Sequence, residues 1–143
     1  STFIVGMPGE REEDYEELLK FVQETRFRKM GAFIYSREEG TPAYDMPHQV
    51  PNATKKKRLD QLMNLQQGIS REIQDSMVGR QLKVLIDEPQ DKEKGIYLGR
   101  SQYDAPEVDG IVYVHSSKPL SKGQFVEVKI TEAYEYDLAG EML

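Results

Sequence analysis

The chain has 143 residues, of which 38% are hydrophobic and 31% are charged, and its formal net charge is −6. Its length suits one ordinary domain or two small ones, and its composition excludes an intrinsically disordered chain. The sequence contains no cysteine, which excludes disulfides, a thiol nucleophile and thiolate ligands for zinc or iron–sulfur clusters among these residues. No apolar run approaches the roughly 20 residues of a membrane span, and no signal peptide is visible, so we expect a cytoplasmic protein without a membrane partner.

The N-terminal part has the pattern of a βαβ unit. Residues 2–5 (TFIV) are apolar on both sides and predict a buried parallel strand. Residues 12–25 have an acidic start and apolar side chains at helical spacing, which predicts an amphipathic helix. Residues 32–35 (AFIY) predict the next strand. This order demands a parallel sheet. Since two strands and one helix cannot bury both faces of such a sheet, we expect its remainder to come from residues outside this sequence.

A long helix is predicted after an irregular connection over residues 36–53. Apolar residues at spacings of three and four run over residues 55–78, with Thr54 as the expected N-cap and Gly79 at the position of a C′ glycine. About 24 residues span roughly 36 Å, which suits a helix that joins two bodies. The alternative is an outer helix of the same α/β layer.

From Arg80 onward the apolar period changes to that of β-strands. Turn clusters, among them residues 88–92, separate five short segments that predict strands at 81–87, 95–100, 111–115, 124–131 and 134–140. We expect these strands to form a closed or nearly closed antiparallel barrel, because closure would remove the exposed edges of a five-stranded sheet.

Two loops at the ends of the predicted parallel strands are candidate ligand sites, because ligands of α/β folds bind at the carboxyl ends of strands. Backbone amides in the first loop could face a polar cofactor group, so Gly6, Pro8 and Gly9 are candidate cofactor-binding residues. The alternative is a tight turn in which Pro8 and Gly9 serve geometry alone. Arg37, at the next strand end, is a candidate substrate contact, and the alternative is a solvated loop.

Charge decides between the possible partners of the barrel. Its aromatic side chains could stack on nucleic-acid bases, but residues 79–143 contain eight Lys and Arg against twelve Asp and Glu, a net charge of −4. Phosphate binding depends on basic residues, so this balance favours a basic protein as partner. Asp104, Glu107 and Asp109 are the candidate contacts in one acidic loop, and the alternative is a solvated turn. We interpret the basic run 55–58 (KKKR) as a solvated helix face.

Several segments resemble the radical-SAM methylthiotransferases. Residues 3–10 (FIVGMPGE) resemble the FIVGFPGE run of that family, although Met7 stands where Phe is usual and Arg11 follows where Thr is common. Residues 35–43 (YSREEGTPA) resemble the next strand end, and residues 62–70 (LMNLQQGIS) resemble the connecting helix. The predicted barrel resembles the TRAM domain, the OB-like module that ends these enzymes.

The family has two branches of interest here. One modifies a tRNA adenosine, and the other modifies an aspartate of small-subunit ribosomal protein twelve. Residues 84–89 (VLIDEP), 99–110 (GRSQYDAPEVDG) and 135–138 (EYDL) are similar to the second branch. The resemblance implies a parent enzyme that adds a methylthio group to the β-carbon of that aspartate by radical chemistry. The tRNA-modifying branch is one alternative, and a non-enzymatic, free-standing OB-like module that binds RNA or protein is another.

The resemblance also implies a domain plan and a set of cofactors. The expected fold is α/β plus all-β: a C-terminal βαβ remnant of a partial TIM-like radical-SAM barrel over residues 1–53, a connecting helix over 54–79, and a five-stranded antiparallel OB-like TRAM barrel over 80–143. The parent would use two [4Fe–4S] clusters and S-adenosylmethionine. Since the family's cluster cysteines are absent, we expect no catalytic residue and no metal ligand in this chain, and no activity of the chain alone. The TRAM domain would recognise the ribosomal protein, with tRNA the less favoured partner.

Overall fold

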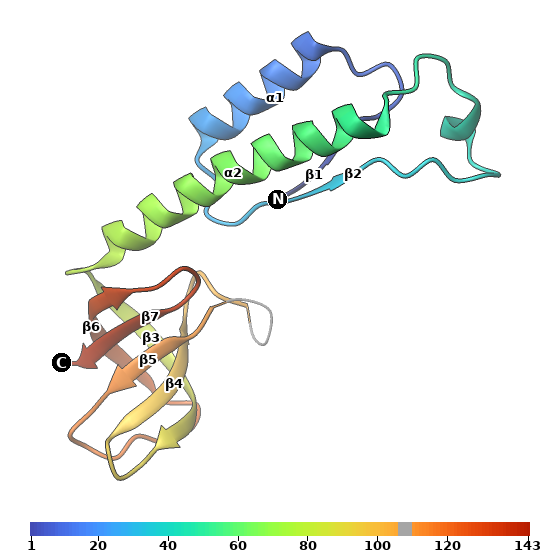
Figure 1. The fold of residues 1–143 in the computed structure, drawn as a ribbon. Helices are drawn as coiled ribbons and strands as arrows, with labels where there is room; N and C mark the ends of the chain where they lie inside the picture. Colours follow the sequence, from blue (N-terminus) through green and yellow to red (C-terminus); the bar gives the residue numbers. More distant parts are fainter. Residues whose placement is uncertain (106–109) are drawn as a thin grey trace. The chain divides into compact units, whose positions relative to one another are not determined.

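The computed structural model describes residues 1–105 and 110–143. It divides into two compact units, Ser1–Ser70 and Arg71–Leu143. The first unit contains β1 (Thr2–Val5), α1 (Glu12–Thr25), β2 (Gly31–Ile34), the short 3-10 helix η1 (Pro42–Asp45) and most of α2 (Asn52–Met77) (Figure 1). The second contains the end of α2 and five strands, β3 (Gln81–Asp91), β4 (Ile96–Ser101), β5 (Val112–His115), β6 (Phe125–Ala133) and β7 (Leu138–Met142).

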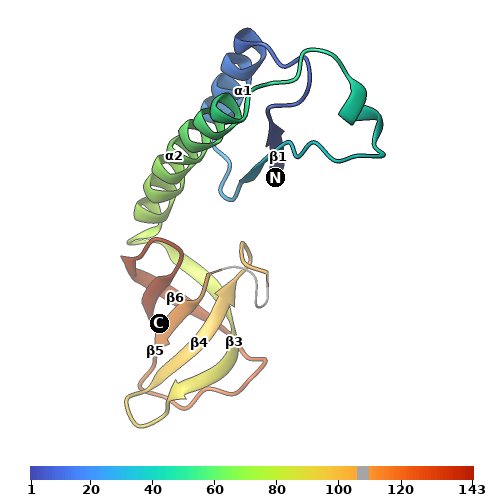
Figure 2. The ribbon, with the colours of Figure 1, turned by 45° about the vertical axis from the view of Figure 1, so that its right-hand side comes forward.

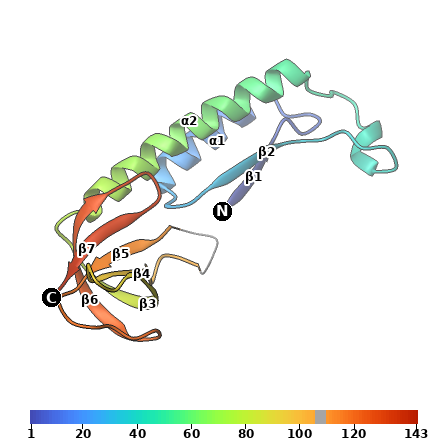
Figure 3. The ribbon, with the colours of Figure 1, turned by 60° about the horizontal axis from the view of Figure 1, so that its bottom comes forward.

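In the first unit the predicted parallel pairing of the two strands is confirmed. Thr2 is the register partner of Gly31, and Val5 is that of Ile34. Helices α1 and α2 lie side by side along the strand pair (Figures 1 and 3). Burial of Tyr15 and Val22 shows which face of α1 packs inward. The fold of this unit is therefore one βαβ element with a second helix added.

The β1–β2 pair leaves apolar side chains uncovered within this chain. The register partners Ile4 and Phe33 are 56% and 64% exposed. Around Phe3, by contrast, the rings of Phe21 and Phe27 pack edge-to-face, with centroids 6.2 and 5.6 Å from that of Phe3. Large apolar side chains on neighbouring strands are normally covered when a sheet is complete.

Helix α1 has the predicted bounds, whereas α2 begins before the predicted residue. The amide of Arg11, the N-cap of α1, donates to Asp14 Oδ2 at 2.8 Å, so a carboxylate in the first turn satisfies this backbone donor. Helix α2 begins at Asn52, and Thr54 lies inside it instead of capping it. The Lys55 amide already donates to the carbonyl of Pro51 at 3.0 Å, and proline just before a helix is pre-organised for that geometry. Gly79 follows the helix with φ +85°, as a C′ glycine does.

The five strands of the second unit form a closed barrel in the order β3-β4-β5-β7-β6 (Figure 2). Four pairings are antiparallel, but β5 and β7 are parallel, so the expectation of an antiparallel barrel is wrong. The reason is geometric. Each antiparallel pairing reverses strand direction, and five reversals cannot return to the starting direction around a ring. A closed barrel of five strands must therefore contain at least one parallel pair, which the β5-to-β6 crossover supplies here.

Two strand boundaries also differ from the prediction. Strand β3 continues to Asp91 through residues expected to form a turn, and register shifts beside Glu88 and Pro89 accommodate the proline. Residues 134–137 form a turn in place of the start of a strand, with the Tyr134 amide donating to the Asp137 carbonyl at 2.8 Å. Bulges and tight turns depend on pairing across the sheet, so alternation of side chains alone misplaced these ends.

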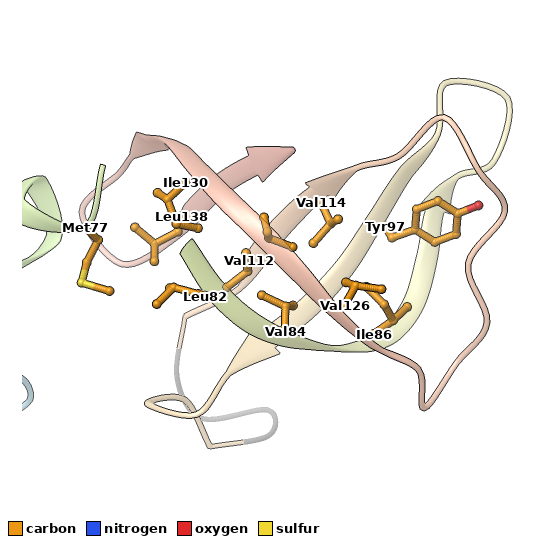
Figure 4. Close-up of a cluster of buried hydrophobic side chains, with 11 residues drawn as sticks. Met77, Leu82, Val84, Ile86, Tyr97, Val112, Val114, Val126, Ile130 and Leu138 are labelled. Carbon is orange, nitrogen blue, oxygen red and sulfur yellow. The ribbon is translucent and has the colours of Figure 1, made fainter. Parts of the chain in front are cut away.

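The barrel has its own core. Along β6 buried and exposed residues alternate, as they must when one face of every strand points inward. Figure 4 shows the cluster, which extends from Met77 of α2 at one end to Tyr97 of β4 at the other. Its members are buried and apolar: Met77, Leu82, Val84, Ile86, Tyr97, Val112, Val114, Val126, Val128, Ile130 and Leu138.

Candidate functional sites

The turn between β1 and α1 is built on two glycines in the left-handed region. Gly6 has φ +81° and Gly9 has φ +83°, which a residue with a Cβ rarely adopts. The Gly6 amide donates to Glu10 Oε2 at 3.0 Å, and the Gly9 amide donates to the His48 carbonyl at 2.9 Å. Both amides that were candidates for a polar cofactor group thus have partners within the chain. Pro8 has no amide hydrogen, so a ligand at this turn would meet other atoms.

Arg58 of α2 fixes Glu10 at the end of this turn. Its Nη1 lies 2.8 Å from Glu10 Oε1 and 3.3 Å from the Glu10 carbonyl oxygen, and its Nη2 lies 3.0 Å from Glu12 Oε2. The side chains of Arg58 and Glu10 are largely buried, whereas that of Glu12 is exposed. Burial acts to lower the pKa of the Arg58 guanidinium, but hydrogen bonds to Glu10 and Glu12 outweigh it and the net shift is upward. The guanidinium is therefore a permanent cation against the turn.

Lys55 contacts the other end of the same turn. Its Nζ donates to the Tyr35 carbonyl at 3.1 Å and lies 4.9 Å from the centroid of the Tyr35 ring. Its aliphatic stem passes over Gly6, because a Cβ added to Gly6 would lie 2.4 Å from Lys55 Cγ. Glycine at position 6 is thus required both by φ and by the close approach of this lysine.

The interpretation of the basic run 55–58 as a solvated helix face is wrong for two of its four cations. Lys55 is 3% exposed and Arg58 is 6% exposed, whereas Lys56 and Lys57 are exposed. Residues three apart share one face of a helix, and this face of α2 meets the β1–α1 turn. The spacing of Lys55 and Arg58 was the signal available in the sequence, but their acceptors, Tyr35 and Glu10, are distant along the chain.

The carboxyl ends of β1 and β2 meet beside this turn. The Tyr35 amide donates to the Val5 carbonyl at 2.8 Å. The Tyr35 hydroxyl is buried and has no hydrogen-bond partner among the described residues. Met7 and Ile34, which belong to the same two chain segments, are exposed apolar side chains. A buried hydroxyl without a partner is uncommon in folded proteins, so this edge suits a ligand or chain segment with both polar and apolar parts.

Arg37 lies on the loop that follows β2. Its Nε donates to the Tyr44 carbonyl at 2.9 Å, and its guanidinium carbon lies 4.6 Å from the centroid of the Tyr44 ring. The side chain therefore braces the loop against η1. Its substrate contact stays a prediction.

The acidic loop after β4 is described only at its two ends. Ser101 Oγ donates to Asp104 Oδ2 at 2.7 Å, which forms a local turn. Glu107 and Asp109, the other two candidates, lie outside the described residues. Beyond them, the Ile111 amide donates to Asp137 Oδ1 at 2.8 Å. A Cβ on Gly110 would lie 1.8 Å from the Tyr136 carbonyl oxygen. The backbone at Gly110 is therefore packed tightly against the β6–β7 turn.

Among residues 1–105 and 110–143, no group of three or more His, Cys, Asp or Glu side chains could hold a metal ion. Nor does that part of the chain contain a helix with the length and apolar character needed to cross a bilayer. The residues present do not fit an iron–sulfur cluster, since the sequence has no cysteine.

Residues 78–143 match the TRAM domain family. The whole chain is also similar to curated proteins named ribosomal protein uS12 methylthiotransferase RimO. The relative from Desulforamulus reducens is 49% identical over 99% of this chain, that from Thermoanaerobacter sp. is 54% identical over 99%, and that from Petrotoga mobilis is 47% identical over 100%.

The match covers only part of those relatives. The chain spans about a third of their length, 32% of the first two proteins and 33% of the third. The aligned stretch is 99–100% of this chain, so it includes the β1–α1 turn, α2 and the barrel. The chain therefore shows the resemblance to the radical-SAM methylthiotransferases that its sequence indicated, with RimO proteins among the proteins similar to it, and its residues 78–143 match the TRAM domain.

Proposed function

We propose that this chain is the C-terminal part of a radical-SAM methylthiotransferase that adds a β-methylthio group to an aspartate of small-subunit ribosomal protein twelve. The observation that carries the proposal is similarity to RimO proteins at 47–54% identity over 99–100% of the chain. The uncovered Ile4 and Phe33 side chains on β1 and β2 support it, because a longer parallel sheet would cover them. A ribosomal substrate would make the parent enzyme cytoplasmic.

The proposal is tested with the longer enzyme and its substrate. Purified enzyme, reconstituted anaerobically and supplied with S-adenosylmethionine, a sulfur source and a one-electron reductant, should replace one hydrogen of the ribosomal protein by a methylthio group, which mass spectrometry detects. Fragmentation should place the group on an aspartate, and replacing that aspartate by alanine should abolish the product. Incorporation into tRNA adenosine instead would support the alternative branch, and no product on either would refute the proposal.

The cofactor chemistry of the parent enzyme would take place outside the five-stranded barrel of β3–β7. The parent would carry two [4Fe–4S] clusters, one of which would supply reductive cleavage of S-adenosylmethionine, and the ligands of both would be cysteines that this chain lacks. Gly6, Pro8 and Gly9 would lie against S-adenosylmethionine. Since the Gly6 and Gly9 amides already donate to Glu10 and His48, contact would involve other turn atoms and the Tyr35 hydroxyl. The chain alone should then be inactive, and anaerobic reconstitution with iron and sulfide should leave its visible absorbance flat.

We further propose that the barrel binds the ribosomal protein in preference to tRNA. The support is the net charge of −4 over residues 79–143, which attracts a basic protein and repels a polyanion. Asp104, Glu107 and Asp109 are the proposed contacts, and Arg37 is a proposed substrate contact of the first unit. The proposed domain boundaries remain 1–53, 54–79 and 80–143.

Charge reversal tests the acidic loop. Glu107→Lys with Asp109→Lys should weaken binding to the ribosomal protein, most strongly at low salt, where charges are least screened. Glu88→Lys with Glu93→Lys is the matched control, because these exposed carboxylates of the same barrel lie elsewhere and change the net charge equally. Equal loss in both pairs would show a general charge effect, and tighter binding of tRNA than of ribosomal protein by the wild-type enzyme would refute the partner.

A further inference from the structure

The turn after β1 is contacted at both ends by one face of α2. At its beginning, the stem of Lys55 lies against Gly6 and leaves no room for a Cβ there. At its end, Arg58 Nη1 binds both the carboxylate and the carbonyl oxygen of Glu10. Glu10 in turn accepts the hydrogen bond of the Gly6 amide. Lys55 and Arg58 are therefore connected through Gly6 and Glu10 of the turn.

The same cations tie the turn to its neighbours. Lys55 Nζ binds the Tyr35 carbonyl, so the residue that follows β2 is linked to α2 directly. The carbonyl of Arg58 accepts a hydrogen bond from the buried Tyr15 hydroxyl of α1 at 2.8 Å. Two residues in one helical turn of α2 therefore contact the ends of both strands and the first part of α1.

We propose that Lys55 and Arg58 are positioning residues: they fix the β1–α1 turn in the conformation that binds S-adenosylmethionine. The inference rests on the proposed function for the location of the cofactor. A turn with two residues at positive φ has other accessible conformations once its side-chain contacts are removed, because glycine places few limits on its backbone. Binding energy would then be used to order the turn.

The test compares buried and exposed cations of the same run in the full-length enzyme. Lys55→Met keeps most of the stem against Gly6 and removes the ammonium, and Arg58→Lys keeps the charge but loses the bidentate contact. Lys56→Met and Lys57→Met are the matched controls, since both side chains are exposed. Calorimetric titration with S-adenosylhomocysteine should give a Kd at least fivefold higher for each buried-site variant and within twofold of wild type for each control.

Two further measurements separate positioning from a general loss of stability. Hydrogen exchange over residues 3–12 should become faster in the buried-site variants, while exchange in β3–β7 and the cluster absorbance stay as in wild type. The KM for S-adenosylmethionine should rise with kcat preserved at saturation. Glu10→Gln should reproduce the effect, and combined with Arg58→Lys it should add less than the two single changes predict.

The outcomes are distinct. Wild-type enzyme that does not bind S-adenosylhomocysteine would contradict the proposed function. Wild-type enzyme that binds it, with unchanged Kd in the Lys55→Met and Arg58→Lys variants, would overturn the positioning role alone. If either variant fails to fold, Glu10→Gln carries the test, because it retains the shape and one acceptor of the carboxylate.

Discussion

The two units of this chain bury their apolar side chains in different ways. The barrel closes on itself, and its eleven-residue core is surrounded by strands of the same unit. The first unit has two strands, and its register partners Ile4 and Phe33 are both more than half exposed. A closed sheet completes its own core, whereas an open one needs further strands or a partner. We therefore expect the barrel to fold without the first unit, and the first unit to be unstable by itself.

Separating the units should give the largest effect. Residues 71–143 expressed alone should unfold in one cooperative denaturant transition, because the complete core cluster lies within them. Residues 1–70 alone should show no cooperative transition or should self-associate through the β1–β2 surface. Circular dichroism and sedimentation velocity check both statements. A soluble, cooperatively folding 1–70 fragment would remove the contrast.

Within the barrel, a buried and an exposed residue of β6 sharpen the comparison. Ile130→Ala should lower the free energy of unfolding by about 2–5 kcal/mol, because it leaves a cavity in the closed core. Ile130 is 1% exposed, whereas Phe125 on the same strand is 64% exposed. Phe125→Ala should therefore change the free energy by no more than about 0.5 kcal/mol. Equal effects in urea denaturation would show that β6 does not face the core as described.

In the first unit, two glycines differ in what a methyl group would meet. Gly6→Ala should lower the stability of the first unit by about 1–2 kcal/mol because of its positive φ alone. The steric overlap of the new methyl group with Lys55 Cγ should lower it further. At Gly31 a Cβ meets nothing within 4 Å and φ is not positive, so Gly31→Ala should be neutral or slightly stabilising. Hydrogen exchange of α1 and β1 in the full-length enzyme measures both. A tolerated Gly6→Ala would contradict the packing of α2 on the turn.

The smallest effect is expected at Tyr15. Burial is the main cause that raises the pKa of its hydroxyl above the ordinary value. The folded state therefore holds the hydroxyl proton more tightly than the unfolded state. The stability that comes from keeping Tyr15 protonated is fully present below the unfolded pKa of about 10, and it is lost as pH rises through the pKa of the folded state. Tyr15→Phe should abolish the loss of stability at alkaline pH. It should also lower the free energy of unfolding by about 1 kcal/mol, because the Tyr15 hydroxyl donates to the Arg58 carbonyl and to Gln61 Oε1. Unfolding of the full-length enzyme at pH 8 and pH 11 tests this, and an unchanged alkaline loss would exclude Tyr15 as its source.

Local patterns determined the elements of this protein. The apolar run of residues 2–5, the helical spacing over 12–25 and the glycine at 79 each depend on neighbours in sequence, and each predicted element is present. The motif at residues 3–10 also indicated the family that the relatives show. Periodicity reports which side of an element is buried, and that information is contained within about ten residues.

Only the tertiary structure decided how the elements pair and which charges are buried. The parallel β5–β7 pair follows from closing a ring of five strands, a condition that alternation in single strands cannot express. The burial of Lys55 and Arg58 depends on Tyr35 and Glu10, which are 20 and 48 residues away. A basic run resembles a solvated helix face until its acceptors are placed, because a charge is buried only where a distant segment supplies oxygen atoms to receive it.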